Sequence, residues 1–583
     1  MFLATTADQR FWKKDDKIFF LGEWCKLFNQ KHIWSKLNYQ VLPYHWQSRE
    51  EASQAYIYLE QLYEQWLPIL AKNLNTIHNE DHSDRYWRII LSPWLYYFIQ
   101  IFYDRYLSIR SAIDGQQVNH TWIPHLSKTD FTPNDFNTFS KWTSQDGYNL
   151  YLYSWLIKAI NIVPAEIKNY STQEQQVPLR RGDNLKSWLK FGLKQLLTVL
   201  PQSHSDILLV SLYIRKQDLV KLQLTLGQFP KFHTGEVSPL KTATDLELRS
   251  KLDIPLGKDE FTSLLSSLIS SQIPKSYLED YSELKNKSRK YFPKNLKVIA
   301  TANAHYGNEG FKICCADSIE KGTRLVGMPH GSNYGTLIWS SNETHEKKIA
   351  DHYFSWGWED KKEPKVIPLP SVQLVGTQKQ ISSDSQGRIL WLGMSLPRYT
   401  KWMASGPRGC EMLEYIEDQK AFLTALSFEI KEMLKMRLYH SDYEWNVMER
   451  LMEDIPDLHF DNRKESLLTE LCKSRLCISS YNASPILETM SANFPTIAFW
   501  NYDQWELRDS AIPYFEELVN VGIFHKNPLS AAKIVNEIYQ DPMPWWLSPE
   551  VQKARVKFCQ QFARTSPTWL SEWKDELFRI AGK

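Results

Sequence analysis

The sequence predicts an α/β protein built on parallel sheets, and three observations support this fold class. Short apolar runs alternate with helical patterns along residues 388–580, as they do in doubly wound domains. Within that stretch, residues 475–500 contain a strand, a tight polar turn, a short helix and a second strand. A unit this compact requires parallel strands, because the helix must return the chain across the sheet. The chain of 583 residues is also too long for one core and long enough for two or three domains.

The first half is expected to be rich in helices, with fewer strands between them. Apolar runs predict strands at residues 2–5, 39–42, 207–214, 296–300, 324–327 and 352–356. Helical periodicity predicts helices at residues 17–29, 50–72, 83–114, 150–162, 185–200 and 310–321. Polar or turn-rich composition predicts loops at residues 121–138, 170–183 and 228–260.

A boundary is predicted at residues 361–386, which are rich in Lys, Pro, Ser and Gln. The apolar run at residues 372–375 is expected to be a strand that leads out of the first half. Beyond the boundary, strands are expected at residues 388–393, 436–439, 458–460, 476–479, 496–500 and 522–525. Helices are expected at residues 412–434, 445–452, 466–473, 486–492, 529–539, 549–563 and 569–580.

These elements divide the chain into two Rossmann-like domains, which face one another across a cleft in the architecture called GT-B. The first domain is expected at residues 1–370 and carries helical insertions. The second is expected at residues 385–565, and a last helix within residues 566–583 is expected to pack back on the first. Ligands of open parallel sheets bind at the carboxyl ends of the strands, which is where we seek functional residues.

Composition argues against several classes of function. The net charge is +2 and no long run of Lys or Arg is present, so nucleic acid is not an expected partner. The seven cysteines form no CxxC pair, as is typical of reduced thiols in the cytoplasm. The N-terminus lacks a signal-peptide pattern, and the uncharged run at residues 89–103 is shorter than the roughly 20 residues of a membrane span. We expect a cytoplasmic protein, and peripheral association with a membrane stays open.

The unit at residues 475–500 holds the first candidate site. Ser479, Ser480 and Asn482 follow its first strand, and Ser484 is expected to cap its helix. Hydroxyl groups and the free N–H groups of a helix N-terminus favour the binding of a phosphate. Glu488 lies one turn into the helix and offers a carboxylate to the hydroxyls of a ribose. The alternative is that Ser484 only caps the helix and Glu488 only interacts with the helix dipole.

Two further loops of the second domain contribute candidates. Gly393 follows the first strand and permits close approach of a donor phosphate, although no GxGxxG pattern surrounds it. Arg437 and His440 follow the next strand, where positive charge stabilises a departing nucleotide. The alternative for this loop is a solvated turn with an Arg437–Asp442 ion pair.

The first domain offers a candidate general base in the segment GMPHGSNYG at residues 327–335. Its three glycines suit close approach of a ligand to the backbone. His330 is the first candidate, because an imidazole can take a proton from a hydroxyl group near neutral pH. Glu309 is the alternative base. The structural alternatives are a histidine that bonds within its own turn and a glutamate that stabilises the next helix.

Signatures of several other chemistries are absent from the sequence. It contains no Walker A loop, no HExxH and no GxSxG, and no convincing DxD metal motif. We therefore expect neither a metal ion nor a bound cofactor.

Five segments of the chain carry a resemblance to a known family. They are FLATTADQRFW at residues 2–12, FLGEWC at 20–25, LPYHW at 42–46, DRYWRIILSPWL at 84–95 and MPHGSNYG at 328–335. Together they resemble a family of transferases that is associated with O-antigen and surface polysaccharide synthesis in bacteria. The similarity runs nearly end to end.

The second domain also resembles GT-B enzymes that use CMP-activated ulosonic acids, such as Kdo and sialic-type transferases. In those enzymes a Ser-Ser pair at a helix N-terminus contacts the phosphate or carboxylate of the donor. Ser479 and Ser480 match that pair in type and setting. His440 matches a histidine that contacts the nucleotide phosphate.

The resemblance implies a glycosyltransferase, and the missing metal motif together with the candidate bases predicts that it is inverting and independent of metal. The second domain would bind a nucleotide-sugar donor, and the first a glycan or lipid-linked glycan acceptor at the inner face of the cytoplasmic membrane. His330 or Glu309 would deprotonate the acceptor, while Arg437 would stabilise the leaving nucleotide. Two alternatives stay open: a nucleotide-sugar epimerase or phospho-polyol transferase on the same fold, and a non-catalytic binding protein.

Overall fold

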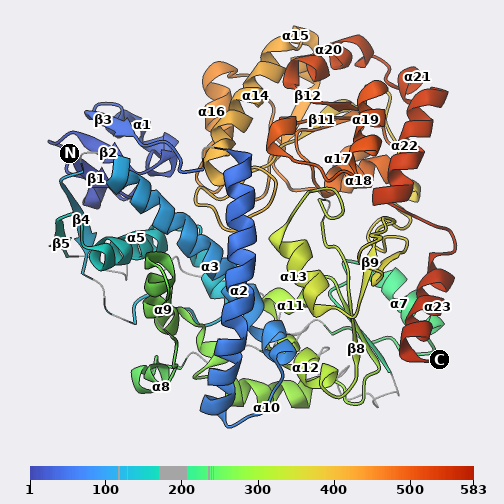
Figure 1. Ribbon diagram of the computed structural model, residues 1–583. Coiled ribbons are helices and arrows are strands. Elements are labelled where there is room, and N and C mark those ends of the chain that lie inside the picture. The colour runs from blue at the N-terminus through green and yellow to red at the C-terminus, as the bar shows by residue number, and fades with distance from the viewer. Residues whose placement is uncertain are drawn as a thin grey trace, which may run out of the picture.

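The prediction of a parallel α/β fold is confirmed by three five-stranded sheets, in which every strand pair is parallel (Figure 1). The structure is a computed structural model. It describes residues 1–46, 48–115, 118–125, 127, 129–169, 206–233, 237, 239, 242–255, 257–331 and 333–583. The loop predicted at residues 170–183 and the helix predicted at 185–200 lie outside the described residues.

The N-terminal unit is built on the first sheet, with the strand order β3-β2-β1-β4-β5. Its strands are β1 (Phe2–Ala4), β2 (Ile18–Phe20), β3 (Tyr39–Val41), β4 (His120–Pro124) and β5 (Ala165–Lys168). The helix predicted at residues 17–29 is wrong, because the run IFFL is a strand buried on both faces and Gly22 follows it. Periodicity cannot distinguish such a short apolar run from a helix. The loop predicted at residues 121–138 likewise contains β4 and the start of α4 (Phe136–Trp142).

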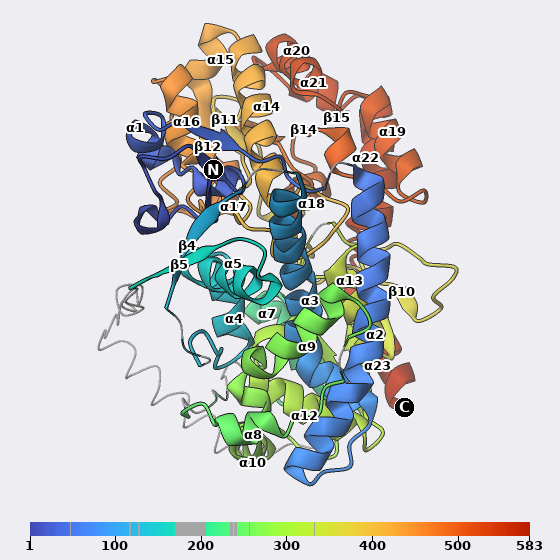
Figure 2. The ribbon, with the colours of Figure 1, turned by 60° about the vertical axis from the view of Figure 1, so that its left-hand side comes forward.

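Two long helices, α2 (Arg49–His78) and α3 (Asp84–Gly115), run side by side through the middle of the molecule (Figures 1 and 2). A capping box begins α2: the Ser48 hydroxyl accepts the Glu51 N–H at 3.1 Å and the Glu51 carboxylate accepts the Ser48 N–H at 3.2 Å. The helix α3 is buried along most of its length, which explains why its sequence is apolar on nearly every face. No helix within the described residues combines the length and apolar character needed to cross a membrane.

The middle lobe contains the second sheet, in the simple order β10-β9-β8-β7-β6. Its strands are β6 (Ile207–Val210), β7 (Val298–Thr301), β8 (Arg324–Gly327), β9 (His352–Ser355) and β10 (Val366–Pro368). The strand predicted at residues 372–375 is wrong, since these residues form a turn after β10. Val372 and Leu374 are apolar because their side chains are buried, and the backbone there pairs with no sheet.

The C-terminal lobe contains the third sheet, in the order β12-β11-β13-β14-β15. Its strands are β11 (Arg388–Leu392), β12 (Leu434–Arg437), β13 (Ser474–Ser479), β14 (Thr496–Phe499) and β15 (Phe524–His525). The helix predicted at residues 412–434 is split into α14 (Met412–Ala425) and α15 (Phe428–Met433), because Leu426 is extended and Ser427 caps the second helix. The strand predicted at 458–460 is reduced to one isolated bridge between Met436 and Phe460.

The middle and C-terminal lobes form the predicted GT-B arrangement of two Rossmann-like lobes, with the N-terminal unit beside them (Figure 1). Isolated bridges join Leu337 to Leu507 and Ser340 to Ala404 across the lobes. Arg398, which is buried, extends from the loop after β11 to the N-terminal unit. Its guanidinium donates to the Trp24 carbonyl, to Asp146 at 3.1 Å and to Glu444 at 2.5 Å.

The last helix, α23 (Trp569–Ala581), leaves the C-terminal lobe and packs on the middle lobe against β7 and α7 (Lys216–Thr225). Trp573 is its main anchor. The indole is buried, donates to the Pro370 carbonyl at 2.9 Å, and meets the Phe354 ring edge to face at 5.1 Å.

We predict that Trp573→Ala lowers the free energy of unfolding by about 3–5 kcal/mol, because a large buried side chain is replaced by a cavity and the Pro370 carbonyl loses its donor. Urea denaturation followed by tryptophan fluorescence measures this change. The exposed neighbour Asp575→Ala is the control and should stay within about 0.5 kcal/mol of the unsubstituted protein. Equal effects of the two substitutions would contradict the anchoring role.

Candidate functional site

His330 lies in the loop that follows β8, at the carboxyl edge of the middle sheet. Its side chain is 23% exposed, so one side of the imidazole reaches the surface. The Nδ1 atom lies 3.0 Å from the Tyr334 hydroxyl and 3.3 Å from a carboxylate oxygen of Glu346. The imidazole is thus held at Nδ1, and none of the residues that the structure describes is bonded to Nε2.

Glu346 is the centre of a buried polar cluster that the sequence analysis missed. It lies on α13 (Ser341–Ile349) and its side chain is fully buried. Its carboxylate accepts hydrogen bonds from the hydroxyls of Tyr306 at 3.0 Å, Tyr334 at 2.7 Å and Tyr353 at 2.9 Å. Several donors to one carboxylate are what a buried negative charge requires.

Burial raises the pKa values of Tyr306, Tyr334 and Tyr353 well above the usual range, and the Glu346 charge adds to this effect. The three hydroxyls therefore stay protonated and act as donors. One signal in the sequence points to the cluster. Glu343, Glu346 and Ile349 are spaced three residues apart, so the two acids share one helix face with the apolar Ile349, and that face of α13 is buried.

Two other histidines lie behind His330. His305 and His345 are buried, with ring centroids 5.5 Å apart. Burial lowers the pKa of His345 to about 3 and that of His305 well below its usual value, so both rings are neutral. Among the described residues, no three His, Cys, Asp or Glu side chains are grouped so that they could hold a metal ion.

Glu309, the alternative base, lies in a separate buried network at the start of α12 (Glu309–Ile319). Its carboxylate pairs with the Lys312 ammonium at 2.6 Å and accepts the Phe136 N–H at 2.9 Å and the Tyr277 hydroxyl at 3.2 Å. Burial raises the pKa of Glu309 and lowers that of Lys312, and each charge opposes the shift of the other. Its contacts match those of a structural ion pair.

In the C-terminal sheet β11 and β13 are neighbours, although β12 comes between them in the chain. The order in which strands are added to the sheet therefore reverses between β11 and β13. Such a switch point leaves a crevice at the carboxyl ends of the two strands. The N-terminal sheet has an equivalent point between β1 and β4, but there the Trp12 and Trp24 indoles are buried and bond to the Thr6 and Thr5 carbonyls.

Ser479 and Ser480 end β13 at this switch point, and both are fully buried. The Ser479 hydroxyl donates to the Tyr481 carbonyl at 3.1 Å. The Ser480 hydroxyl donates to the Leu392 carbonyl at 3.0 Å and lies 2.7 Å from the Tyr415 hydroxyl. Both side chains therefore fix the turn between β13 and α18 (Ser484–Ser491).

The expectation that Ser484 caps this helix is wrong by one position. Ala483 is the N-cap residue with extended backbone, and Ser484 is the first helical residue, followed by Pro485. Ala483 offers no side-chain cap to this helix, and the Ile486 N–H donates to the Ala483 carbonyl at 3.1 Å. A half-buried hydroxyl and a helix N-terminus without a side-chain cap thus lie together at the end of β13.

The loops of the two lobes meet at this point. The Asn482 amide donates to the Thr336 hydroxyl of the His330 loop at 3.2 Å. The Ser484 hydroxyl lies 4.0 Å from the position that a Cβ atom would occupy on Gly331. The structure therefore brings together Asn482, Ser484 and the loop that carries His330, from segments about 150 residues apart in the chain.

Arg437 and His440 differ from each other in their surroundings. The Arg437 guanidinium pairs with the buried carboxylate of Asp461 at 2.5 Å and donates to the Glu465 carbonyl at 3.1 Å. The alternative Arg437–Asp442 pair is wrong, because the Asp442 carboxylate instead accepts backbone N–H groups at the start of α16 (Val447–Asp454). His440 is exposed and contacts the Tyr439 ring.

Gly393 is required by packing at the end of β11. A Cβ atom on Gly393 would lie 3.0 Å from the Met436 side chain and 3.2 Å from that of Leu438. Its N–H group donates to the Arg437 carbonyl at 3.1 Å. The glycine thus allows β11 and β12 to approach each other closely where the two strands end.

Glu488 lies one turn into α18, and burial raises the pKa of its carboxyl group to about 7, while a hydrogen bond from Gln373 opposes the shift. Gln373 belongs to the turn that joins the lobes. At neutral pH this carboxyl group can donate as well as accept a hydrogen bond.

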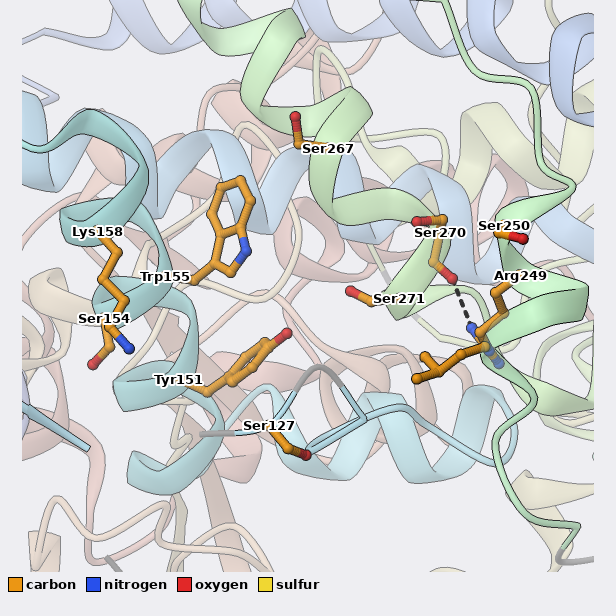
Figure 3. A pocket seen from close by; sticks show the side chains of 11 residues that line it. Ser127, Tyr151, Ser154, Trp155, Lys158, Arg249, Ser250, Ser267, Ser270 and Ser271 are labelled. Carbon is orange, nitrogen blue, oxygen red and sulfur yellow. Dashed lines mark hydrogen bonds between the residues drawn. The ribbon is translucent and has the colours of Figure 1, made fainter. Parts of the chain in front are cut away.

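A cavity of about 420 Å³ lies away from this region, between α5 (Asp146–Ile160), α8 (Leu246–Ser250) and α9 (Glu260–Gln272) (Figure 3). None of the predicted site residues lines it. Its Arg249 guanidinium is bonded to Glu279 and to the carbonyls of Ser270 and Ile273, so this side chain holds the walls together. The residues predicted from the sequence thus lie elsewhere in the molecule.

Comparison with known proteins gives one match over the whole chain. The family model described as LIC12162 family transferase matches residues 1–577. No curated protein matches the sequence significantly.

Several solved structures are similar to part of this chain. Anabaena HepE in complex with UDP-glucose is 10% identical, covers 55% of this chain and 90% of its own, and has a TM-score of 0.33. The UDP-GlcNAc 2-epimerase of Neisseria meningitidis is 11% identical, covers 64% of this chain and 99% of its own, and has a TM-score of 0.37. MurG of Acinetobacter baumannii is 12% identical, covers 64% of this chain and 99% of its own, and has a TM-score of 0.31. Because these TM-scores lie below 0.5, the chemistry of those proteins is not transferred to this chain.

We predict a pH-dependent difference in stability between the unsubstituted protein and Glu488→Gln. Between about pH 4.5 and 7 the native carboxyl group keeps a proton that the unfolded chain has released, so the stability of the unsubstituted protein falls as the pH rises. The glutamine variant lacks this fall. Its free energy of unfolding should therefore rise by about 3 kcal/mol relative to that of the unsubstituted protein across this pH range.

Urea denaturation at half-unit steps from pH 4.5 to 8 measures this difference. The exposed Glu537→Gln is the control, and its difference from the unsubstituted protein should stay constant. A constant difference for Glu488→Gln as well would show that burial does not raise the pKa of Glu488.

Proposed function

We propose that this chain, which belongs to the LIC12162 family of transferases, moves a glycosyl group from a nucleotide-sugar donor to a glycan acceptor between its middle and C-terminal lobes. One observation carries the proposal. The switch point of the C-terminal sheet meets the His330 loop, with Asn482 bonded to Thr336 and Ser484 beside Gly331. A helix N-terminus suited to phosphate and a histidine suited to proton transfer therefore face the same space.

The donor phosphate is proposed to lie at the N-terminus of α18. The Ser484 N–H and hydroxyl groups are proposed to donate hydrogen bonds there, since Pro485 has no N–H and the Ile486 N–H donates to the Ala483 carbonyl, and the helix dipole favours negative charge. Glu488, one turn along, is proposed to bond the ribose hydroxyls. Ser479 and Ser480 act by holding the turn, since their hydroxyls already bond to the protein.

The base is proposed to be His330 rather than Glu309, because Glu309 is already paired with Lys312. The imidazole Nδ1 lies 3.0 Å from the Tyr334 hydroxyl and 3.3 Å from a Glu346 carboxylate oxygen, and with its proton on Nδ1 the ring can take a proton from an acceptor hydroxyl at Nε2. The deprotonated oxygen then attacks the anomeric carbon, and the bond from that carbon to the nucleotide phosphate breaks. A single displacement of this kind inverts the anomeric configuration.

The leaving phosphate gains negative charge as this bond breaks. The N-terminal dipole of α18 is placed to stabilise that charge, which is the usual source of the largest catalytic effect in such transfers. His440, exposed at the end of the neighbouring loop, is a second candidate contact for the nucleotide. Arg437 is proposed to hold the shape of its loop through its bond to Asp461.

The donor proposed first is a CMP-activated ulosonic acid such as Kdo or a sialic-type sugar. The resemblance of the second domain to transferases of such donors supports this choice, while the Ser479 and Ser480 hydroxyls themselves bond within the protein. The acceptor is proposed to be a surface glycan or its lipid-linked precursor, at the inner face of the cytoplasmic membrane.

Nucleotide binding is the first test of the proposal. We predict that one of CMP, UDP, GDP or dTDP raises the melting temperature, because a ligand that binds only the native state at 100 times its Kd adds about 2.7 kcal/mol of stability. Ser484→Ala and Gly331→Val should reduce the shift, the second because its larger side chain enters the space between the loops. Glu537→Ala is the matched surface control. If no nucleotide shifts the melting temperature, the proposed function is wrong.

Once a donor is known, the rate of nucleotide release tests the base. We predict that His330→Asn lowers kcat by about 100- to 10,000-fold, the usual contribution of a general base, without loss of the nucleotide-induced thermal shift. Glu346→Gln should lower kcat in the same way, because the imidazole loses its anionic partner.

Tyr353→Phe is the control for Glu346→Gln, because it removes a donor to the carboxylate oxygen that does not face His330. Its kcat should stay close to that of the unsubstituted enzyme. Full activity of His330→Asn would exclude this histidine as the base and would favour a non-catalytic role for the loop.

A further inference from the structure

The loop that follows β6 has a strained backbone beside His330. Ser211 and Tyr213 have φ angles of 52° and 57°, in the left-handed region that glycine favours. Two such residues within three positions are uncommon, and a bulky aromatic residue is a poor occupant of this region. Strain of this kind persists only where the surrounding structure enforces it, and it is concentrated at functional sites.

Burial does not account for the position of the Tyr213 side chain. The residue is 51% exposed, whereas Leu212 before it is 5% exposed and anchors the loop in the core. A tyrosine with half of its surface in water gains little from packing. The strained backbone therefore presents an aromatic ring to solvent.

Two contacts fix the orientation of this ring. The Asn303 amide donates a hydrogen bond to the Tyr213 hydroxyl. The Tyr213 ring lies nearly parallel to the His330 imidazole, with an angle of 21° and a centroid distance of 6.3 Å. Tyr213, Asn303 and His330 follow β6, β7 and β8, which are neighbouring strands of the middle sheet. The three side chains therefore line one edge of this sheet.

We infer that Tyr213 is the platform on which the acceptor places a pyranose ring. The face of an aromatic ring is electronegative, so it attracts the weakly positive C–H face of a sugar. The Tyr213 hydroxyl and the Asn303 amide can bond to hydroxyl groups at the edge of that sugar. A sugar on this platform is a neighbour of His330, the proposed base.

The position of the platform favours the acceptor over the donor. Tyr213 belongs to the middle lobe, on the side of the base, whereas the proposed phosphate site belongs to α18 of the C-terminal lobe. This inference rests on the proposed function, because it assigns one substrate of the same transfer.

Saturation-transfer NMR tests the platform with simple probes, namely the methyl glycosides of glucose, galactose, N-acetylglucosamine and rhamnose. We expect at least one of them to bind the unsubstituted protein. Tyr213→Phe keeps the ring and should keep most of the affinity. Tyr213→Asn removes the ring and should weaken binding by about tenfold or more, as loss of an aromatic anchor does. Asparagine tolerates the left-handed region, so this variant should melt no lower than the unsubstituted protein.

Phe428→Ala is the matched control, because Phe428 is an exposed aromatic residue on α15 and lies in the other lobe. It should bind the glycosides as the unsubstituted protein does. The inference is overturned if Tyr213→Asn retains full affinity, or if no glycoside binds the unsubstituted protein.

The nucleotide thermal shift of the same variants separates this inference from the proposed function. If a nucleotide raises the melting temperature but glycoside binding does not depend on Tyr213, the platform is wrong and the transferase proposal stands. Glycoside binding that depends on Tyr213, in a protein that binds none of the nucleotides, supports the platform and removes the proposed donor.

Discussion

A fully buried carboxylate must be satisfied from every side, and the arrangement of the candidate site follows from how Glu346 meets this need. Its donors come from α11 (Ala304–Gly307), from the His330 loop and from β9, so one charge ties three separate segments of the middle lobe together. His330 is 23% exposed, and Tyr306 is also partly exposed. The same bonds that stabilise the buried charge therefore orient an imidazole that reaches the surface.

Topology determines what lies opposite that ring. A switch point in a parallel sheet opens a crevice at its carboxyl edge, and the C-terminal sheet places this point between β11 and β13. The N-terminal sheet has its own switch point, but there Trp12 and Trp24 are packed against the ends of the strands. The N-terminus of α18, where we propose that the donor phosphate binds, and the loop that carries His330 thus meet between the middle and C-terminal lobes.

The accuracy of the sequence predictions depended on whether the relevant forces act locally. The unit at residues 475–500 was predicted well because its turn, its proline and its strands each have local signatures, although the cap was misplaced from Ala483 to Ser484. Glu346 was missed because a glutamate in a polar helix resembles a surface acid until its partners, far apart in sequence, are known. The helix predicted at residues 17–29 and the strand predicted at 372–375 were wrong because apolar composition indicates that a segment is buried, but does not by itself determine its backbone conformation.

The buried guanidinium of Arg398 joins the C-terminal lobe to the N-terminal unit through Trp24 and Asp146. Arg508, from the same lobe, holds Glu343 of the middle lobe through two hydrogen bonds of 3.0 and 2.9 Å. A hinge motion that swings the C-terminal lobe outward must break both clamps at once, and each leaves a charge without its partner. Opening between the lobes is therefore costly, and the three parts of the chain are held together as one frame.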